Sequence, residues 1–198
     1  MTDLKHELHR QLKALRAAMM SKLDGLSEYD MRRPMTPTGT NLLGLVKHLA
    51  GNEIAYLSES FGRPSPDVLP WVEDGSIWDG ADMWVTAEES SAYVIGLYRR
   101  ACEAGDATIE ELELDAPASV AHWPQERRAT DLGVLLIRMV AETAQHAGHA
   151  DIIRELIDGR AGADRDEMGD DATWEAFTAR IETAARSFGP TEPRNGPS

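Results

Sequence analysis

The sequence predicts an all-α protein whose main body is a four-helix bundle. Leucine and methionine recur every three or four residues in four long segments, which is the period of an amphipathic helix. Prolines and glycines interrupt the chain between these segments. The 198 residues fit one domain, and a hydrophobic fraction of 42% is sufficient for one core.

The first predicted helix covers residues 3–24, and the stretch RRPMTPTGT at 32–40 separates it from the second. The second helix is expected to begin after Thr40 as its N-cap and to run to about residue 60. One of its faces carries Leu42, Leu45, His48, Leu49, Asn52 and Tyr56.

Residues 61–85 lack a helical period and contain three prolines, three glycines and three tryptophans. A connection of this length is expected either to be functional or to pack over the bundle. The third helix is expected to open with the capping box TAEE at 86–89 and to end near Gly105. A short strand is left open at 108–114.

The fourth helix is the longest, and it is expected to follow Thr130 and to stop at Gly159. A short fifth helix at about 171–185 would pack its Trp174, Phe177 and Ile181 side chains. The predicted organisation is therefore a bundle at 1–160, an accessory helix within 161–188 and a disordered tail, GPTEPRNGPS, at 189–198.

Composition excludes several classes of protein. A net charge of −14 argues against nucleic acid and anionic membranes as partners, since both require a positive surface. A single cysteine, Cys102, excludes an internal disulfide and a cysteine-based zinc site, and it is expected to be a small buried residue. Without a signal peptide or an 18-residue apolar run, the protein is expected to be cytoplasmic.

The stretch AETAQHAGHADIIRELIDG at 141–159 places Glu142, His146 and His149 on the face that carries the apolar residues of the fourth helix. That apolar face is expected to contain Leu135, Met139, Ile153 and Leu156. Unpaired buried charge is unfavourable, so the carboxylate needs a partner, and either a metal ion or a protonated histidine would serve. A hydrogen-bonded core histidine is the alternative to a metal ligand.

Helix geometry separates these three groups. The pair Glu142 and His146 is close enough to chelate one ion, and so is the pair His146 and His149. Glu142 and His149 are about 10 Å apart along the axis, so one of the three is expected to lie in a pocket wall or to support the ligands. His48 on an antiparallel second helix would complete a three-ligand site of the open, catalytic type.

The sequence evidence for a functional role is weaker at the remaining candidate residues. His6 and His9 are expected on an exposed face, and His122 either at a pocket mouth or on a surface loop. Gly148 in mid-helix suggests that a neighbouring helix or a ligand approaches closely there.

The segments ETAQHAGHADIIRELIDG, NLLGLVKHLAGNEIAYL and WDGADMWVTAEES resemble the DinB-like superfamily, most closely its DUF664 branch. The similarity covers about residues 5–160. It implies a DinB/YfiT-like four-helix bundle with a divalent metal held by His48, Glu142 and His146. Many relatives have three histidines; the Glu at 142 is similar to the related mycothiol-dependent maleylpyruvate isomerases.

The resemblance also implies a thiol-dependent S-transferase or isomerase in which the metal activates mycothiol or a similar small thiol. Zinc suits the ligands best, and nickel, iron and manganese remain open. Asn52, Tyr56 and His149 would line the pocket, with His149 also a candidate acid or base. A local arginine such as Arg138 or Arg154 is expected nearby if the co-substrate is anionic.

Two other functions remain open. One is a metal-dependent hydrolase that uses metal-bound water, and the other is a non-enzymatic, metal-binding or stress-related bundle. The expected partners are a small-molecule thiol and an electrophile, and a homodimer is left open.

Overall fold

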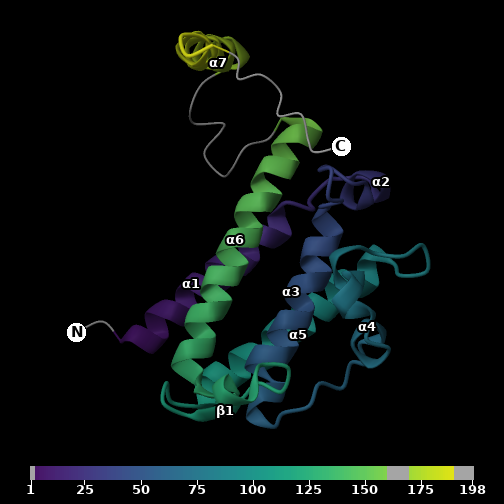
Figure 1. Cartoon of the computed structure of the whole chain (residues 1–198), viewed down its shortest axis with the longest axis vertical. Coiled ribbons are helices and arrows are strands. Elements are labelled where there is room, and N and C mark those ends of the chain that lie inside the picture. Colours follow the sequence, from purple (N-terminus) through teal and green to yellow (C-terminus); the bar gives the residue numbers. More distant parts are fainter. Residues whose placement is uncertain (1–2, 160–169, 190–198) are drawn as a thin grey trace, which may run out of the picture. The chain divides into compact units, whose positions relative to one another are not determined.

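The computed structural model describes residues 3–159 and 170–189, and helices dominate both parts, which confirms the all-α prediction. The chain divides into two units after Gly159. The first unit holds the four long helices of the bundle (Figure 1). They are α1 (Leu4–Ser21), α3 (Leu42–Leu57), α5 (Ser91–Glu111) and α6 (Leu132–Asp158).

The helices meet in pairs. α3 packs extensively on α5, and α6 lies against both α1 and α3. The interior consists mainly of leucine and methionine, as their spacing in the sequence indicates. Fully buried members include Leu12, Met19, Leu45, Leu97, Leu135 and Met139.

Short elements connect the long helices. They are α2 (Glu28–Arg32), η1 (Glu59–Phe61), α4 (Pro70–Glu73), η2 (Ser76–Asp79), η3 (Ala81–Met83) and η4 (Gln125–Arg127). Two three-residue strands, β1 (Pro117–Ser119) and β2 (Ala129–Asp131), pair antiparallel. The strand considered at 108–114 is wrong, because α5 continues as a helix to Glu111.

Two predicted helix starts are also wrong. α3 is capped by Asn41 rather than Thr40, because the Asn41 side chain accepts a hydrogen bond from the Gly44 N–H. α5 is capped by Ser90, four residues after the predicted start at Thr86. Glu89 does accept a hydrogen bond from the Thr86 N–H, but its carboxylate also pairs with Lys47, and residues 86–89 form no helical turn.

Gly105 does not end the third long helix. It lies inside α5 at a point of close approach, where a Cβ atom would be 3.1 Å from Glu53 Oε2 and 3.2 Å from Arg16 Nη2. The glycine is needed for space rather than for a turn. Gly159, in contrast, has φ of 73° and caps α6, as predicted.

A buried ion network joins α1, α3 and α5. Arg16 donates to Glu53 through two nitrogens, at 2.7 and 2.6 Å, and a third nitrogen lies 2.5 Å from Asp106. His9 Nε2 is 2.7 Å from the same Asp106 oxygen. The expectation that His9 is exposed is therefore wrong, because its ring is drawn into the bundle by this carboxylate. Burial would lower the pKa of Arg16, but the Glu53 and Asp106 carboxylates outweigh it and raise the pKa.

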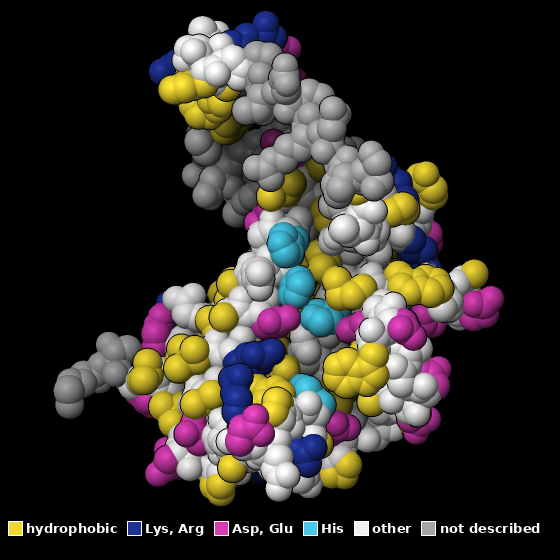
Figure 2. All heavy atoms as spheres, in the orientation of Figure 1, with side chains coloured by type: hydrophobic (Ala, Val, Ile, Leu, Met, Phe, Trp, Pro, Cys, Tyr) yellow, Lys and Arg dark blue, Asp and Glu magenta, His cyan; other side chains and the backbone are white. Residues whose placement is uncertain are grey.

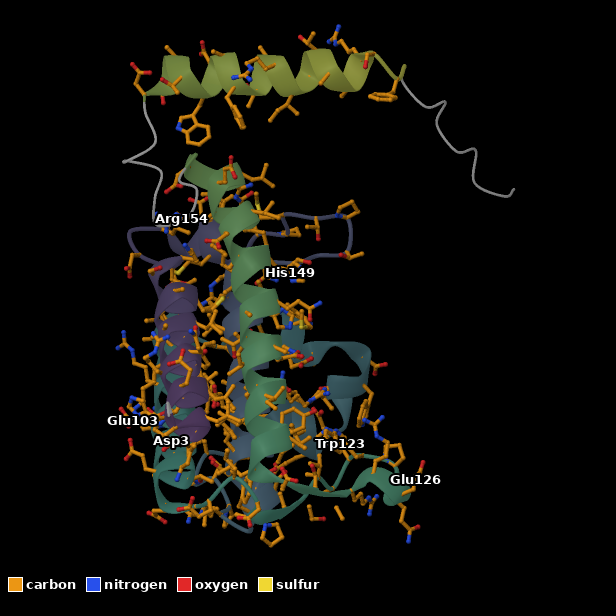
Figure 3. The ribbon with its side chains drawn as sticks, turned by 90° about the vertical axis from the view of Figure 1, so that its left-hand side faces the viewer. Asp3, Glu103, Trp123, Glu126, His149 and Arg154 are labelled. Atoms are coloured by element: carbon orange, nitrogen blue, oxygen red, sulfur yellow. The ribbon has the colours of Figure 1, made fainter. Side chains whose placement is uncertain are left out.

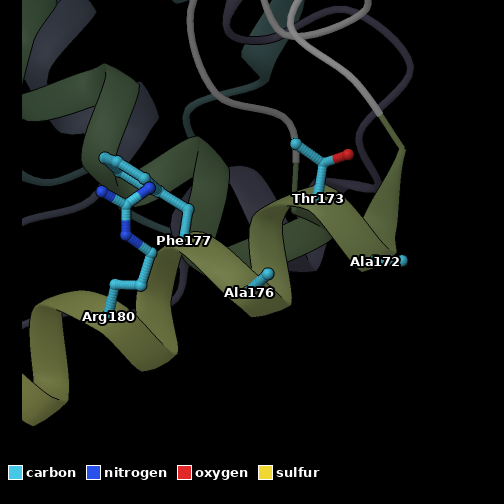
Figure 4. Close-up of a pocket in the computed structure, with 5 residues that line it drawn as sticks. All are labelled: Ala172, Thr173, Ala176, Phe177 and Arg180. Atoms are coloured by element: carbon cyan, nitrogen blue, oxygen red, sulfur yellow. The ribbon is translucent and has the colours of Figure 1, made fainter.

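The second unit contains α7 (Asp171–Arg186), where a helix is predicted, with Asp170 as its N-cap. Trp174 and Phe177 form a T-shaped ring pair, while Phe177 and Ile181 are about half exposed. A shallow hollow on this helix is lined by Ala172, Thr173, Ala176, Phe177 and Arg180 (Figure 4). All five belong to one helix, and among the described residues no other element lines the hollow.

Three further expectations concern the domain boundaries, the 61–85 segment and membrane-spanning helices. The proposed domain boundaries stay a prediction, and the tail from 190 onward lies outside the described residues. Residues 61–85 do pack on the bundle through Trp71, which is buried, whereas Trp78 and Trp84 are exposed. Within the described ranges, every helix is too short or too polar to span a bilayer.

Candidate metal centre

His48, Glu142 and His146 meet where α3 and α6 run side by side. His48 Nε2 and His146 Nε2 each lie 3.2 Å from Glu142 Oε1, and one ligand atom from each residue lies within 4.8 Å of the others. This set is called the triad below. Its members are partly buried, with side-chain exposures of 20%, 23% and 13% for His48, Glu142 and His146.

The helices explain this convergence. Glu142 and His146 are four residues apart on α6, so their side chains emerge from neighbouring turns of one face. His48 reaches them from α3, and the ring centroids of His48 and His146 are 4.9 Å apart. The ring of His149 follows at 5.6 Å from that of His146, which produces the row of histidines on the face shown in Figure 2.

A fourth residue, Asp82, orients His48. Its Oδ2 atom lies 2.6 Å from His48 Nδ1, so the Nδ1 proton is directed to the carboxylate and Nε2 is turned toward Glu142. A carboxylate behind a ligating imidazole is a common arrangement in metal sites, where it fixes the ring and its tautomer. The sequence reasoning missed Asp82; the available signals were the WDGAD motif and the unusual length of the 61–85 segment.

The segment that carries Asp82 is tied to α3. Lys47 is almost fully buried, and its ammonium group donates to the carbonyls of Ala81 and Trp84 and pairs with Glu89. The same group lies 4.2 Å from the centroid of the Trp71 ring. Lys47 therefore holds the backbone on both sides of Asp82.

Gly44 allows the same segment to approach α3 closely. A Cβ atom at this position would overlap the carbonyl of Met83, and Asn41 donates to that carbonyl at 3.1 Å. The η3 turn therefore rests directly on the first turn of α3. The position of Asp82 is set by packing and hydrogen bonds on both sides.

The charges within the triad influence each other. Burial would raise the pKa of Glu142, but the adjacent His48 and His146 outweigh it and lower that pKa. Burial would lower the pKa of His48, but its hydrogen bonds to Asp82 and Glu142 raise it. Burial and the neighbouring His48 lower the pKa of His146. These directions favour an ionised Glu142 and a neutral His146, the forms in which the two residues bind a metal, whereas the raised pKa of His48 favours a proton that an ion would have to displace.

Of the three residues predicted for the pocket, Asn52 and His149 contact members of the triad, whereas Tyr56 contacts His122. The Asn52 amide is 2.9 Å from His48 Nε2 and 3.4 Å from Glu142 Oε1. Tyr56, one turn further along α3, is buried, with its hydroxyl 3.2 Å from His122 Nε2. His149 is exposed on the other side of the triad; Figure 3 shows it on the same side of α6 as Trp123.

Several other expectations are corrected by their contacts. Arg154 is not near the triad, because it pairs with Asp158 and donates to the carbonyl of Lys22. No group closely approaches Gly148, since a Cβ atom there would meet nothing within 4 Å among the described residues. Leu156 is 62% exposed rather than part of the apolar face. His122, in contrast, lies on an exposed loop, which is one of the two positions expected for it, and it contacts Tyr56.

Cys102 was expected to be buried; it is half-buried and packs against the core of the bundle. Burial raises the pKa of its thiol well above the usual value, so it is not a nucleophile at neutral pH.

Comparison with known proteins agrees with this architecture. The model of the mycothiol S-transferase family matches residues 7–159, which contain the whole bundle and every residue of the triad. A conserved protein from Enterococcus faecalis has a similar solved structure, with a TM-score of 0.58 at 14% identity, covering 81% of this chain and all of the other. At that identity the likeness shows the fold alone. No curated protein matches.

Proposed function

Because the chain belongs to the mycothiol S-transferase family, we propose that it is a divalent-metal-dependent S-transferase acting with a small thiol of the mycothiol type. The metal is inferred from the triad, in which three donor atoms from two helices lie within 4.8 Å of one another. The family match supports the thiol and the transfer reaction, and the triad supports the metal.

The donor set fits such an ion. Ligand bonds of about 2 Å at tetrahedral angles separate neighbouring donors by about 3.3 Å. The two nitrogen-to-oxygen distances in the triad are both 3.2 Å. Two imidazoles and one carboxylate leave an open position, as catalytic zinc sites do, although nickel, iron and manganese accept the same ligands.

Neighbouring residues orient the donor atoms of the triad through hydrogen bonds. Asp82 accepts a hydrogen bond from the Nδ1–H of His48, which leaves Nε2 directed at Glu142. Asn52 contacts both His48 Nε2 and Glu142 Oε1, so it limits the rotation of each. A divalent ion bound here would lower the pKa of a coordinated thiol and so supply a thiolate at neutral pH. The partly exposed face of the triad admits a small thiol from solvent.

The test is metal content followed by thiol transfer. Tag-free protein is expected to contain about one divalent ion per chain by elemental analysis, and His48→Ala and Glu142→Gln to lose it. His6→Ala, on an exposed position of α1, is the matched control and should keep the metal. A wild-type protein that takes up no divalent ion contradicts the metal-dependent mechanism.

Activity is measured with mycothiol and a panel of electrophiles. Removal of the ion with a chelator should abolish conjugation, and addition of zinc should restore it. Metal-loaded protein that transfers mycothiol to none of the electrophiles contradicts the S-transferase proposal and leaves a metal-binding bundle.

A further inference from the structure

Three arginines gather around Trp123, and no carboxylate of the described part of the chain pairs with them. The guanidinium carbons of Arg127 and Arg138 lie 5.7 and 5.5 Å from the centre of the indole ring, and Arg128 donates to the Trp123 carbonyl. None of the three forms an ion pair with a described residue. Basic side chains elsewhere in the bundle are mostly paired, for example Lys22 with Asp151, Arg63 with Glu111 and Arg100 with Asp67.

This local excess of positive charge is unexpected in a chain with a net charge of −14. Basic residues on an acidic protein are normally neutralised by nearby carboxylates. Clustered unpaired charges of one sign raise the local concentration of ligands of the opposite sign. The arginines around Trp123 therefore favour an anion.

Arg138 is the member that faces the triad. It lies on α6 one turn before Glu142, at a separation of about 6 Å along the helix. On α3, Asn52 and Tyr56 follow His48 at intervals of four residues. Tyr56 is the last of these three residues, and the guanidinium carbon of Arg138 lies 4.8 Å from the centre of its ring. Arg138 is exposed, lies on the same face of α6 as Glu142 and contacts Tyr56 of α3.

The contacts of Arg138 leave its hydrogen-bond donors free. The guanidinium carbon lies over the rings of Tyr56 and Trp123, while the N–H groups bond to no described residue. The N–H edge of a guanidinium matches the two oxygens of a carboxylate. Partial burial, together with the charge of Arg138, lowers the pKa of His122, so the positive charge beside Tyr56 comes from Arg138 rather than from His122.

We propose that Arg138 is a specificity-determining residue that binds the carboxylate of an anionic electrophile whose reactive carbon lies at the triad. This inference rests on the proposed S-transferase function and names its substrate class. In the transfer, the thiolate sulfur forms a bond to the electrophilic carbon, the leaving group departs with the bonding electron pair, and the thiol proton passes to solvent.

A matched pair of electrophiles tests the proposal. In 4-chloro-3-nitrobenzoate and its methyl ester, sulfur displaces chloride from the same aromatic ring, and only the acid has a carboxylate. Arg138→Met is expected to lower kcat/KM for the acid by roughly 10–100-fold, the range for a charged hydrogen bond, with little change for the ester. Arg138→Lys, which retains the charge and loses the planar edge, should fall in between.

Arg99→Met is the control for the change in net charge, since Arg99 is exposed on α5 and forms no ion pair with a described residue. It should leave both substrates unaffected. Equal losses on the acid and the ester in Arg138→Met would show a merely structural role and overturn the proposal, as would the absence of any loss.

Binding measured without thiol separates this inference from the proposed function. Isothermal titration of wild-type protein with 4-chloro-3-nitrobenzoate should give a Kd that rises in Arg138→Met and not in Arg99→Met. If this holds while no thiol is transferred to either electrophile, the S-transferase proposal fails and the anion site stands. If thiol transfer proceeds while neither Kd nor kcat/KM responds to Arg138, the anion site fails alone.

Discussion

Two clusters of ionisable side chains lie between the helices of the bundle, and both combine histidine with carboxylate. In the first, Arg16, Glu53, Asp106 and His9 hydrogen-bond to one another, and Glu53 is completely buried. In the second, the two imidazoles of the triad are directed at a single carboxylate oxygen and remain partly exposed. The first cluster contains a permanent cation, whereas the second contains none.

This difference separates a structural network from a candidate binding site. The guanidinium of Arg16 neutralises the carboxylates beside it, so the first cluster needs no further ion and has no space for one; even a Cβ atom on Gly105 would crowd Glu53. The triad has a free edge toward solvent and donor atoms suited to a divalent ion. The presence of arginine, rather than the number of histidines and carboxylates, distinguishes the two.

The largest expected effect comes from removing the permanent cation. Arg16→Met leaves Glu53 buried without its partner and should lower the free energy of unfolding by about 3–5 kcal/mol. Chemical denaturation followed by circular dichroism measures the change. The double variant Arg16→Met with Glu53→Leu should recover most of it, because the completely buried carboxylate is gone and the partly exposed Asp106 keeps His9 as a partner. Equal stability of Arg16→Met and wild type would contradict the structural role of the network.

The next effect concerns the support of His48. Asp82→Asn should weaken metal affinity by roughly 10–100-fold, the usual effect of losing a carboxylate behind a ligating histidine. Competition with a chromophoric chelator gives the affinity, and Asp79→Asn, on the exposed surface of the same segment, serves as the control. An unchanged affinity in Asp82→Asn would separate Asp82 from the triad.

A smaller effect depends on pH. Partial burial would raise the pKa of Asp106, but the hydrogen bond from His9 and the charge of Arg16 lower it. The stabilisation by this carboxylate is therefore fully present above the pKa of Asp106 in the unfolded chain, about 4, and is lost as the pH falls through the lowered native value.

Asp106→Asn should accordingly be about 1 kcal/mol less stable than wild type at pH 6, and the difference should shrink toward pH 3. Urea denaturation at a series of pH values measures it. A difference that stays constant down to pH 3 would show that the carboxylate charge is not responsible.

The smallest effect compares two glycines in the middle of helices. Gly148→Ala, beside the triad, meets no described atom within 4 Å and should stabilise the protein by about 0.5–1 kcal/mol. Gly105→Ala introduces contacts of 3.1–3.2 Å with the ion network and should lose that gain or destabilise. Thermal unfolding distinguishes the two; equal gains would mean that the network yields easily to an added methyl group.

Local patterns in the sequence were sufficient for the helices and for part of the candidate site. The three-to-four periodicity predicted the four long helices, and Gly159 predicted the end of α6. The spacing of Glu142 and His146 predicted that these side chains are neighbours, because residues four apart on a helix always are. These features depend on residues within one or two turns of each other.

Only the tertiary structure decided which polar residues meet. Asp82 reaches His48 because Lys47 and Gly44 hold a distant segment against α3, and His9 is buried because Asp106 on another helix attracts it. Periodicity carries no information about such partners, since it describes one helix at a time. Whether Arg138 pairs with a carboxylate or stacks on Tyr56 and Trp123 was likewise a question of packing between elements far apart in the chain.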